Sequence, residues 1–143
     1  MSNILSLKLL TFAAIAVLAS AVTFAIDEDI SPEAKESDRR VAAEAKLKAE
    51  SSSVTLYAKG LCCPSCSIGV RKMVSKLDFV DRNRFNKGVE LDTKMQLVSV
   101  AVREGANVNY DSLATAVEKA GYNPVRAYSI DDGALKTQSL VAR

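Results

Sequence analysis

The sequence contains no histidine and no tryptophan, and only three cysteines and three prolines among 143 residues. The absence of histidine excludes a Ser-His-Asp or Cys-His catalytic centre, a zinc site with imidazole ligands and a histidine general base. The formal net charge of +2 gives no reason to expect nucleic acid as a partner. Reactive chemistry therefore has to come from cysteine, carboxylates, lysine or tyrosine.

The N-terminal segment has the pattern of a secretory signal. Leu9–Ile26 is an uncharged apolar run that follows Lys8, and Ala19–Ala21 fits the small-residue cleavage rule. We expect residues 1–25 to be a signal peptide; an uncleaved signal anchor is the alternative, because a run of about 18 residues approaches the length that spans a bilayer. In both cases the rest of the chain is exported to an oxidising compartment. We expect the bacterial periplasm, either free or anchored to the membrane and facing the periplasm.

Residues 26–53 are rich in charge and alanine. Ser31–Glu33 is a typical helix start, with an N-cap, a proline at the first helical position and an acid near the positive end of the dipole. Val41 and Leu47 are the only large apolar residues that follow Ile30 in this segment. A helix without an apolar stripe has no face to bury, so we expect a solvated, charged linker that is helical or flexible.

From Val54 onward the apolar pattern alternates between period 2 and helical spacing. The expected strands cover 54–59, 79–91, 97–102 and 125–129, and the expected helices follow Pro64 and a cap at Asp111 or Asn109. This β-α-β-β-α-β order predicts an α+β, ferredoxin-like sandwich at 54–129, a four-stranded antiparallel sheet with two helices on one face. Residues 130–143 have no clear pattern, and we expect a loose C-terminal tail.

All three cysteines lie in the segment Gly60–Cys66, where the first expected strand passes into the first expected helix. We expect Cys63 at the helix N-cap and Cys66 in the first turn, where backbone N–H groups and the helix dipole favour thiolates. Two thiolates separated by two residues can converge on one soft ion. Thiolates select soft metals, and a structural zinc site normally has four ligands. The sequence therefore predicts Cu(I) or Hg(II) rather than zinc or cadmium.

The segment resembles the heavy-metal-associated domain family, which occurs in copper chaperones, metal-transporting ATPases and periplasmic mercury-binding proteins. Gly60–Cys66 matches the family motif G-M-x-C-x-x-C, with Leu61 in the place of the methionine. Ala120–Tyr122 resembles the A-G-Y sequence that ends the second helix of the family. The resemblance covers about 54–128, roughly half of the chain.

The resemblance implies that Cys63 and Cys66 are the paired metal ligands, that Leu61 is a packing residue and that Tyr122 lies beside the metal loop. It implies an exported carrier, not an enzyme, that sequesters or transfers the ion by thiolate ligand exchange. The implied partners are the metal ion and a membrane metal transporter or another metal carrier. Contact with the membrane is expected only through an uncleaved signal anchor.

Cys62 departs from the family motif. It is a candidate third metal ligand; the alternatives are a disulfide and a small buried residue, a role that free cysteine often has. The Cys-x-x-Cys pair also permits two other functions, a thiol–disulfide redox protein or an interaction domain with a structural disulfide. The missing tryptophan before the motif and the order of the elements argue against the redox function, and the odd number of cysteines makes the structural one awkward.

The region Asp81–Gln96 is longer than the corresponding segment of the family. It contains Arg82, Arg84 and Lys87, which would suit a surface that faces a partner. A solvated hairpin is the simpler interpretation, and we favour it.

Overall fold

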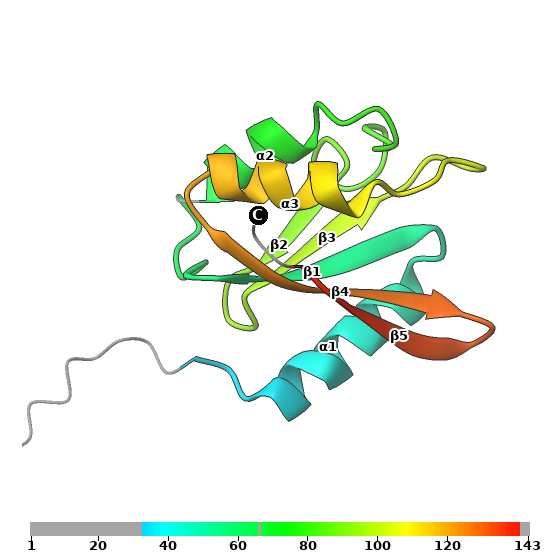
Figure 1. Cartoon of the computed structure of the whole chain (residues 1–143), viewed down its shortest axis with the longest axis horizontal. Coiled ribbons are helices and arrows are strands. Elements are labelled where there is room, and N and C mark those ends of the chain that lie inside the picture. The colour runs from blue at the N-terminus through cyan, green and yellow to red at the C-terminus, as the bar shows by residue number, and fades with distance from the viewer. Residues whose placement is uncertain (1–32, 66, 141–143) are drawn as a thin grey trace, which may run out of the picture.

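One antiparallel sheet of five strands organises residues 33–65 and 67–140, the part of the chain that the computed structural model describes (Figure 1). The elements are α1 (Glu36–Ala49), β1 (Ser53–Lys59), α2 (Ser67–Val74), β2 (Val89–Asp92), β3 (Leu97–Ala101), α3 (Tyr110–Lys119), β4 (Asn123–Asp131) and β5 (Ala134–Ser139). The expected signal peptide, residues 1–25, lies outside the described residues. Within the described ranges, no helix is both long and apolar enough to cross a bilayer.

The strand order in the sheet is β2-β3-β1-β4-β5, and every neighbouring pair is antiparallel. The helices α2 and α3 cross the same face of the sheet, above it in Figure 1. The succession β1-α2-β2-β3-α3-β4 is therefore the ferredoxin-like arrangement, and the predicted α+β class is confirmed. The prediction of four strands and two helices was incomplete, because β5 extends one edge and α1 covers the other face.

The central strand β1 is buried on both faces, from Val54 to Ala58. Because side chains alternate along a strand, Val54, Leu56 and Ala58 belong to the core beneath α2 and α3, and Tyr57 belongs to a second cluster with α1. Each face of the sheet therefore needs a helical cover.

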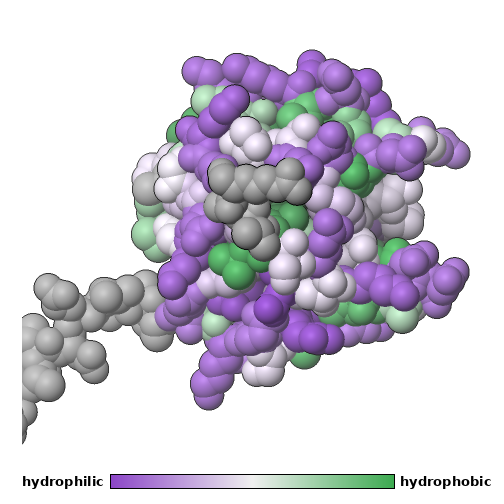
Figure 2. Space-filling model, viewed as in Figure 1, coloured by the Kyte–Doolittle hydropathy of each residue, from purple (hydrophilic) through white to green (hydrophobic). Residues whose placement is uncertain are grey.

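The larger core lies between the sheet and α2 and α3. Both helices supply fully buried apolar side chains to it, namely Val70, Val74, Leu113 and Val117. Of the two expected caps, Asn109 caps α3, and its Oδ1 accepts from the Ser112 N–H at 2.9 Å. Hydrophilic residues lie along the upper rim of the molecule, over the outer sides of the two helices (Figure 2). These are the amphipathic helices that the spacing predicts.

The segment expected to be a solvated linker contains α1, which packs against the sheet. Ala43 and Leu47 are buried in a cluster with Tyr57, Leu97 and Tyr128. Small alanine side chains let the helix approach the sheet closely, so a narrow stripe is enough. The expectation counted only large apolar residues, and one of those, Val41, is 69% exposed.

A buried arginine fastens α1 to the sheet. The Arg39 guanidinium stacks over the Tyr57 ring, 3.6 Å from Cζ to the ring centroid, and is only 3% exposed. It donates to the Ala34 carbonyl at 2.7 Å, to the Met95 carbonyl at 3.2 Å and to Gln96 Oε1 at 3.3 Å, and it pairs with the Glu36 carboxylate at 3.1 Å. These partners compensate the burial of the charge. Glu36 also pairs with Arg126 and accepts from the Tyr128 hydroxyl.

The segment 130–143 was expected to be a loose tail, but its described residues complete β4 and form β5. Ile130 pairs with Leu135 and Tyr128 with Thr137 across a tight hairpin. The turn residues Asp132 and Gly133 both have positive φ, +52° and +76°, which suits an Asp-Gly turn of type I′. The strand β5 was not predicted because it lies at the sheet edge. Its side chains are mostly exposed and polar, so they show no period-2 apolar pattern.

The segment between α2 and β2 is a compact loop rather than the expected strand that begins at Phe79. The hairpin expected within 81–96 is present only in its last part, where β2 pairs with β3. Only 89–92 form a strand, while Val80 makes an isolated bridge with Val102. The Arg84 guanidinium pairs with Glu50 at 2.6 Å and donates to the backbone carbonyls of Ser51 and Ser52. This arginine therefore fixes the loop to the start of β1.

Replacing Arg39 with alanine should lower the free energy of unfolding by about 2–4 kcal/mol, because the ring stacking and several buried hydrogen bonds are lost together. Urea unfolding followed by circular dichroism measures the change. Arg40→Ala is the matched control, since Arg40 is exposed on the same helix, and it should change stability by no more than about 0.5 kcal/mol. Equal effects of the two substitutions would contradict the anchoring role of Arg39.

Stability should fall in alkali through Tyr128. Burial, together with the nearby Glu36 carboxylate, raises the pKa of Tyr128 above its ordinary value. Because the pKa of Tyr128 is higher in the folded state than in the unfolded state, where it is about 10, the neutral hydroxyl stabilises the fold fully below that unfolded-state pKa. This contribution is lost as the pH rises through the folded-state pKa. The free energy of unfolding of Tyr128→Phe, measured in urea from pH 8 to 11, should depend less on pH above 10 than that of the wild type. A Tyr110→Phe protein should keep the wild-type dependence.

Candidate metal centre

The cysteine loop joins the end of β1 to the start of α2. Leu61 is fully buried in the core beneath α2 and α3, and its N–H donates to the Ala58 carbonyl at 3.3 Å. Gly60 has a φ of +90°, a backbone conformation that glycine adopts without strain. The chain thus turns sharply after β1, and the buried Leu61 holds the residues that follow it at the surface.

The start of α2 differs from the expected capping. Pro64 and Ser65 form a turn, and the described helix runs from Ser67. Cys63 is therefore not the N-cap residue. The Ile68 N–H donates to the Ser65 carbonyl at 3.4 Å, and the Ser67 hydroxyl donates to the Pro64 carbonyl. A proline favours the start of a helix but is equally suited to a turn, and these two bonds stabilise the turn.

The structure places Cys62 and Cys63 differently. Cys62 is exposed and its thiol is free. Cys63 is half-buried and disulfide-bonded, and its Sγ accepts a hydrogen bond from Ser65 Oγ at 3.8 Å. Cys66, the second expected ligand, lies outside the described residues. A disulfide sulfur is not a thiolate, so Cys63 has to be reduced before it can bind a metal.

No cluster of three cysteine, aspartate or glutamate side chains in 33–65 and 67–140 is arranged to hold a metal ion. Residues 60–65 of the cysteine loop contain two cysteines and no carboxylate, so sulfur atoms are the main side-chain donors of this described segment. Such a donor set matches soft ions and does not suit magnesium or calcium, which prefer oxygen ligands.

Tyr122 lies beside the cysteine loop. A β-carbon built on Gly60 would stand 3.9 Å from Cδ1 of the tyrosine ring. One built on Gly69, near the start of α2, would stand 3.8 Å from the β-carbon of Ala120. The end of α3 and the cysteine loop are thus neighbours, as the resemblance implies, and Tyr122 is half-buried there.

Two residues near the loop were missed by sequence reasoning. Ser65 contacts the Cys63 sulfur, and its position between the two cysteines was the only signal. Gln96 lies in the turn before β3, and its carbonyl accepts from the Ala58 N–H at 3.0 Å. Its φ of +55° is unusual for a residue other than glycine, and nothing in the local sequence indicates the contact.

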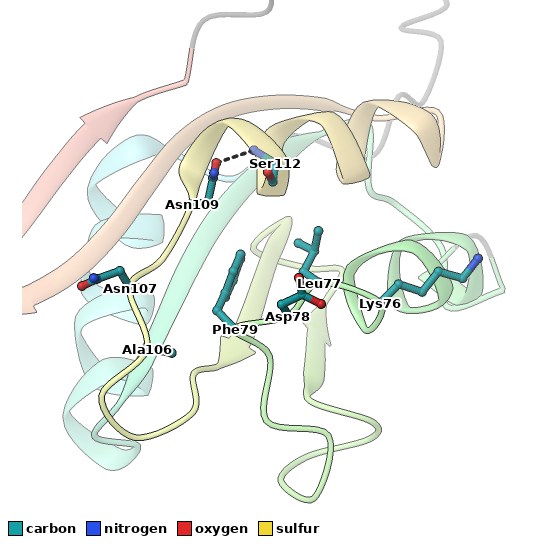
Figure 3. Close-up of a pocket in the computed structure, with 8 residues that line it drawn as sticks. All are labelled: Lys76, Leu77, Asp78, Phe79, Ala106, Asn107, Asn109 and Ser112. Carbon is teal, nitrogen blue, oxygen red and sulfur yellow. Dashed lines mark hydrogen bonds between the residues drawn. The ribbon is translucent and has the colours of Figure 1, made fainter.

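A separate cavity of about 460 Å³ lies between the segment that follows α2 and the start of α3 (Figure 3). It is lined by Lys76, Leu77, Asp78, Phe79, Ala106, Asn107, Asn109 and Ser112. No cysteine or other expected site residue is among them, so this cavity is separate from the candidate metal centre.

No family model and no curated protein matches the chain. A search of solved structures finds a chain described as a CopZ metallochaperone, with 23% sequence identity and a TM-score of 0.43. The match covers 52% of this chain and 100% of that chain. Similarity of this degree establishes neither membership of a family nor a function.

Leu61 should tolerate methionine but not alanine. Leu61→Ala leaves a cavity beneath the loop and should cost about 2–5 kcal/mol of stability, whereas Leu61→Met conserves volume and should cost less than about 1.5 kcal/mol. Thermal unfolding of the oxidised protein measures both changes. If the alanine variant were as stable as the methionine variant, Leu61 would not be the packing residue that supports the loop.

Proposed function

We propose that the chain binds a soft metal ion, Cu(I) or Hg(II), between the thiolates of Cys63 and Cys66 and passes it to another protein. The observation that carries the proposal is the gathering of all three cysteines in Gly60–Cys66, a surface loop that the buried Leu61 supports, in a chain without histidine. The N-terminal apolar run supports export, and we propose the periplasm as the compartment. A membrane metal transporter or another carrier is the proposed recipient.

Binding would begin with reduction of the Cys63 disulfide. Two thiols of a reductant supply two electrons and two protons; the protein disulfide becomes two thiols, and the reductant becomes a disulfide. Two thiolates then bind the ion as their protons leave. A thiolate of the recipient adds to the metal, and one protein thiolate departs, so no bond of an organic substrate is broken. The exposed Cys62 thiol is a candidate third ligand during this exchange.

A second candidate function is an interaction domain with a structural disulfide. The disulfide at Cys63 favours it, because an oxidised pair binds no soft metal. The two functions differ in what reduction should do. A metal carrier gains its activity when reduced, whereas a structural disulfide only loses stability.

The reduced protein should take up one equivalent of Cu(I) from a chromophoric chelator under anaerobic conditions, and much less Zn(II). Cys63→Ser and Cys66→Ser should each lower the affinity for Cu(I) by at least about tenfold, because each removes one thiolate of the proposed pair. Competition absorbance with the chelator measures both stoichiometry and affinity. Cys62→Ser is the matched control in the same loop, and a lower affinity in that variant would assign Cys62 to the metal.

Unchanged uptake in both the Cys63 and the Cys66 variants would overturn the proposal. If the reduced wild type takes up no Cu(I), and Cys63→Ser unfolds at lower urea than the oxidised wild type, the structural disulfide is the better description. Metal content of protein isolated anaerobically from its cell then identifies the ion that the chain carries.

A further inference from the structure

A basic pocket of about 450 Å³ lies between α2 and the loop that precedes β2. Its lining consists of Ile68, Arg71, Lys72, Ser75, Asn86 and Lys87. Three of these residues carry a positive charge and none carries a negative one. Arginine and lysine with a neighbouring amide group are donors that bind phosphate oxygens, whereas the Ser75 hydroxyl already bonds to the backbone carbonyls of Arg71 and Lys87.

The pocket is a fixed part of the fold. The Ser75 hydroxyl donates to the Lys87 carbonyl at 2.7 Å, and the Arg82 side chain donates back to the Ser75 carbonyl at 2.6 Å. Gly88 follows with a φ of +84°, packed so closely against Val80 and Asp81 that no side chain fits there. The loop that carries Asn86 and Lys87 is therefore held against the end of α2, so its backbone needs little ordering to bind a ligand.

An exposed apolar side chain stands at the edge of the pocket. Ile68 is 63% exposed, one of two large apolar residues so exposed in the described part of the chain. Lys72 follows one helical turn after Ile68, a spacing that places both residues on the same face of α2. A combination of apolar and basic residues on one face is typical of segments that lie on a bilayer surface.

We propose that this pocket binds the phosphate group of an anionic lipid and docks the domain on a bilayer surface. Positive charges near such a surface are attracted to its anionic lipids, and Ile68 gains burial at the interface. This contact would be additional to an uncleaved signal anchor. A bilayer is favoured over an acidic protein because the exposed Ile68 would gain burial in a bilayer beside the basic residues. The apolar run Leu9–Ile26 would add a second contact if it is not cleaved.

That run would keep the pocket within reach of the bilayer if it is not cleaved. Nine residues separate Ile26 from the start of α1, and nine residues extend over at most about 30 Å. Docking itself does not need a metal. Docking would bring the cysteine loop close to a membrane transporter. Only this consequence of docking rests on the proposed function.

The absence of tryptophan makes the test direct. Ile68→Trp introduces the sole tryptophan of the full-length protein at an exposed position. The protein is reconstituted into vesicles of phosphatidylcholine alone or of phosphatidylcholine with about one third phosphatidylglycerol, whose negative surface potential attracts basic residues. The tryptophan emission should shift to shorter wavelength only in the anionic vesicles, and added salt should reverse the shift.

Two charge-reversed variants with equal net charge distinguish binding at the pocket from a general electrostatic attraction of the protein to the vesicles. Lys72→Glu with Lys87→Glu, in the tryptophan background, should lose the shift. Lys94→Glu with Lys136→Glu changes two exposed lysines outside the pocket and should keep it. A shift that survives in the pocket variant, or equal emission in the two kinds of vesicle, overturns the proposal.

Two further probes identify the source of the anion. If inorganic phosphate changes the tryptophan emission in solution while anionic vesicles do not, the pocket is a site for the free ion and not for a lipid. If a glutamate-rich peptide shifts the emission while anionic vesicles do not, the partner is an acidic protein. Normal docking by a protein that takes up no Cu(I) would overturn the proposed function alone and would support the lipid site.

Discussion

The burial of the central strand on both faces is the constraint from which the rest of the structure follows. Five consecutive residues, Val54–Ala58, are inaccessible to solvent, so the sheet cannot leave either side in water. One side is covered by α2 and α3 in the ordinary way, with apolar side chains. On the other side Thr55 bonds to Ser99 at 3.0 Å and Tyr57 stacks against Arg39. The polar side chains on that face need hydrogen-bond or stacking partners because they are buried. The helix α1 supplies the cover.

The strongly periodic part of the fold could be predicted from the sequence, and the cover of the second face could not. The strands and helices of the ferredoxin-like core have clear apolar spacing, which local physics dictates. The helix α1 hides a narrow stripe of Ala43 and Leu47 next to a buried arginine. The acceptors of Arg39 include Met95 and Gln96, more than fifty residues away, so no local pattern shows that the charge is satisfied. Edge position accounts in the same way for the unpredicted β5.

The candidate site also has features that the sequence predicts and features that only the tertiary structure shows. The placement of the cysteines on a surface loop follows from their spacing and from Leu61, an apolar residue that belongs in the core. The closeness of Tyr122 to Gly60 was expected only from resemblance, because tertiary structure brings these residues together. Whether Cys63 is a thiol or a disulfide is not encoded by spacing at all, since both forms fit two cysteines three positions apart, and the compartment decides between them.

The cover of the second face and the cysteine loop share a residue. Gln96 accepts from Arg39 through its side chain and from the Ala58 N–H through its carbonyl, just before the chain turns at Gly60. Arg39 thus fastens α1 and, through Gln96, supports the base of the loop that carries the cysteines. A helix that looks like a linker in the sequence is therefore part of the support of the candidate metal centre. The first turns of α1 consequently lie next to the β2–β3 turn.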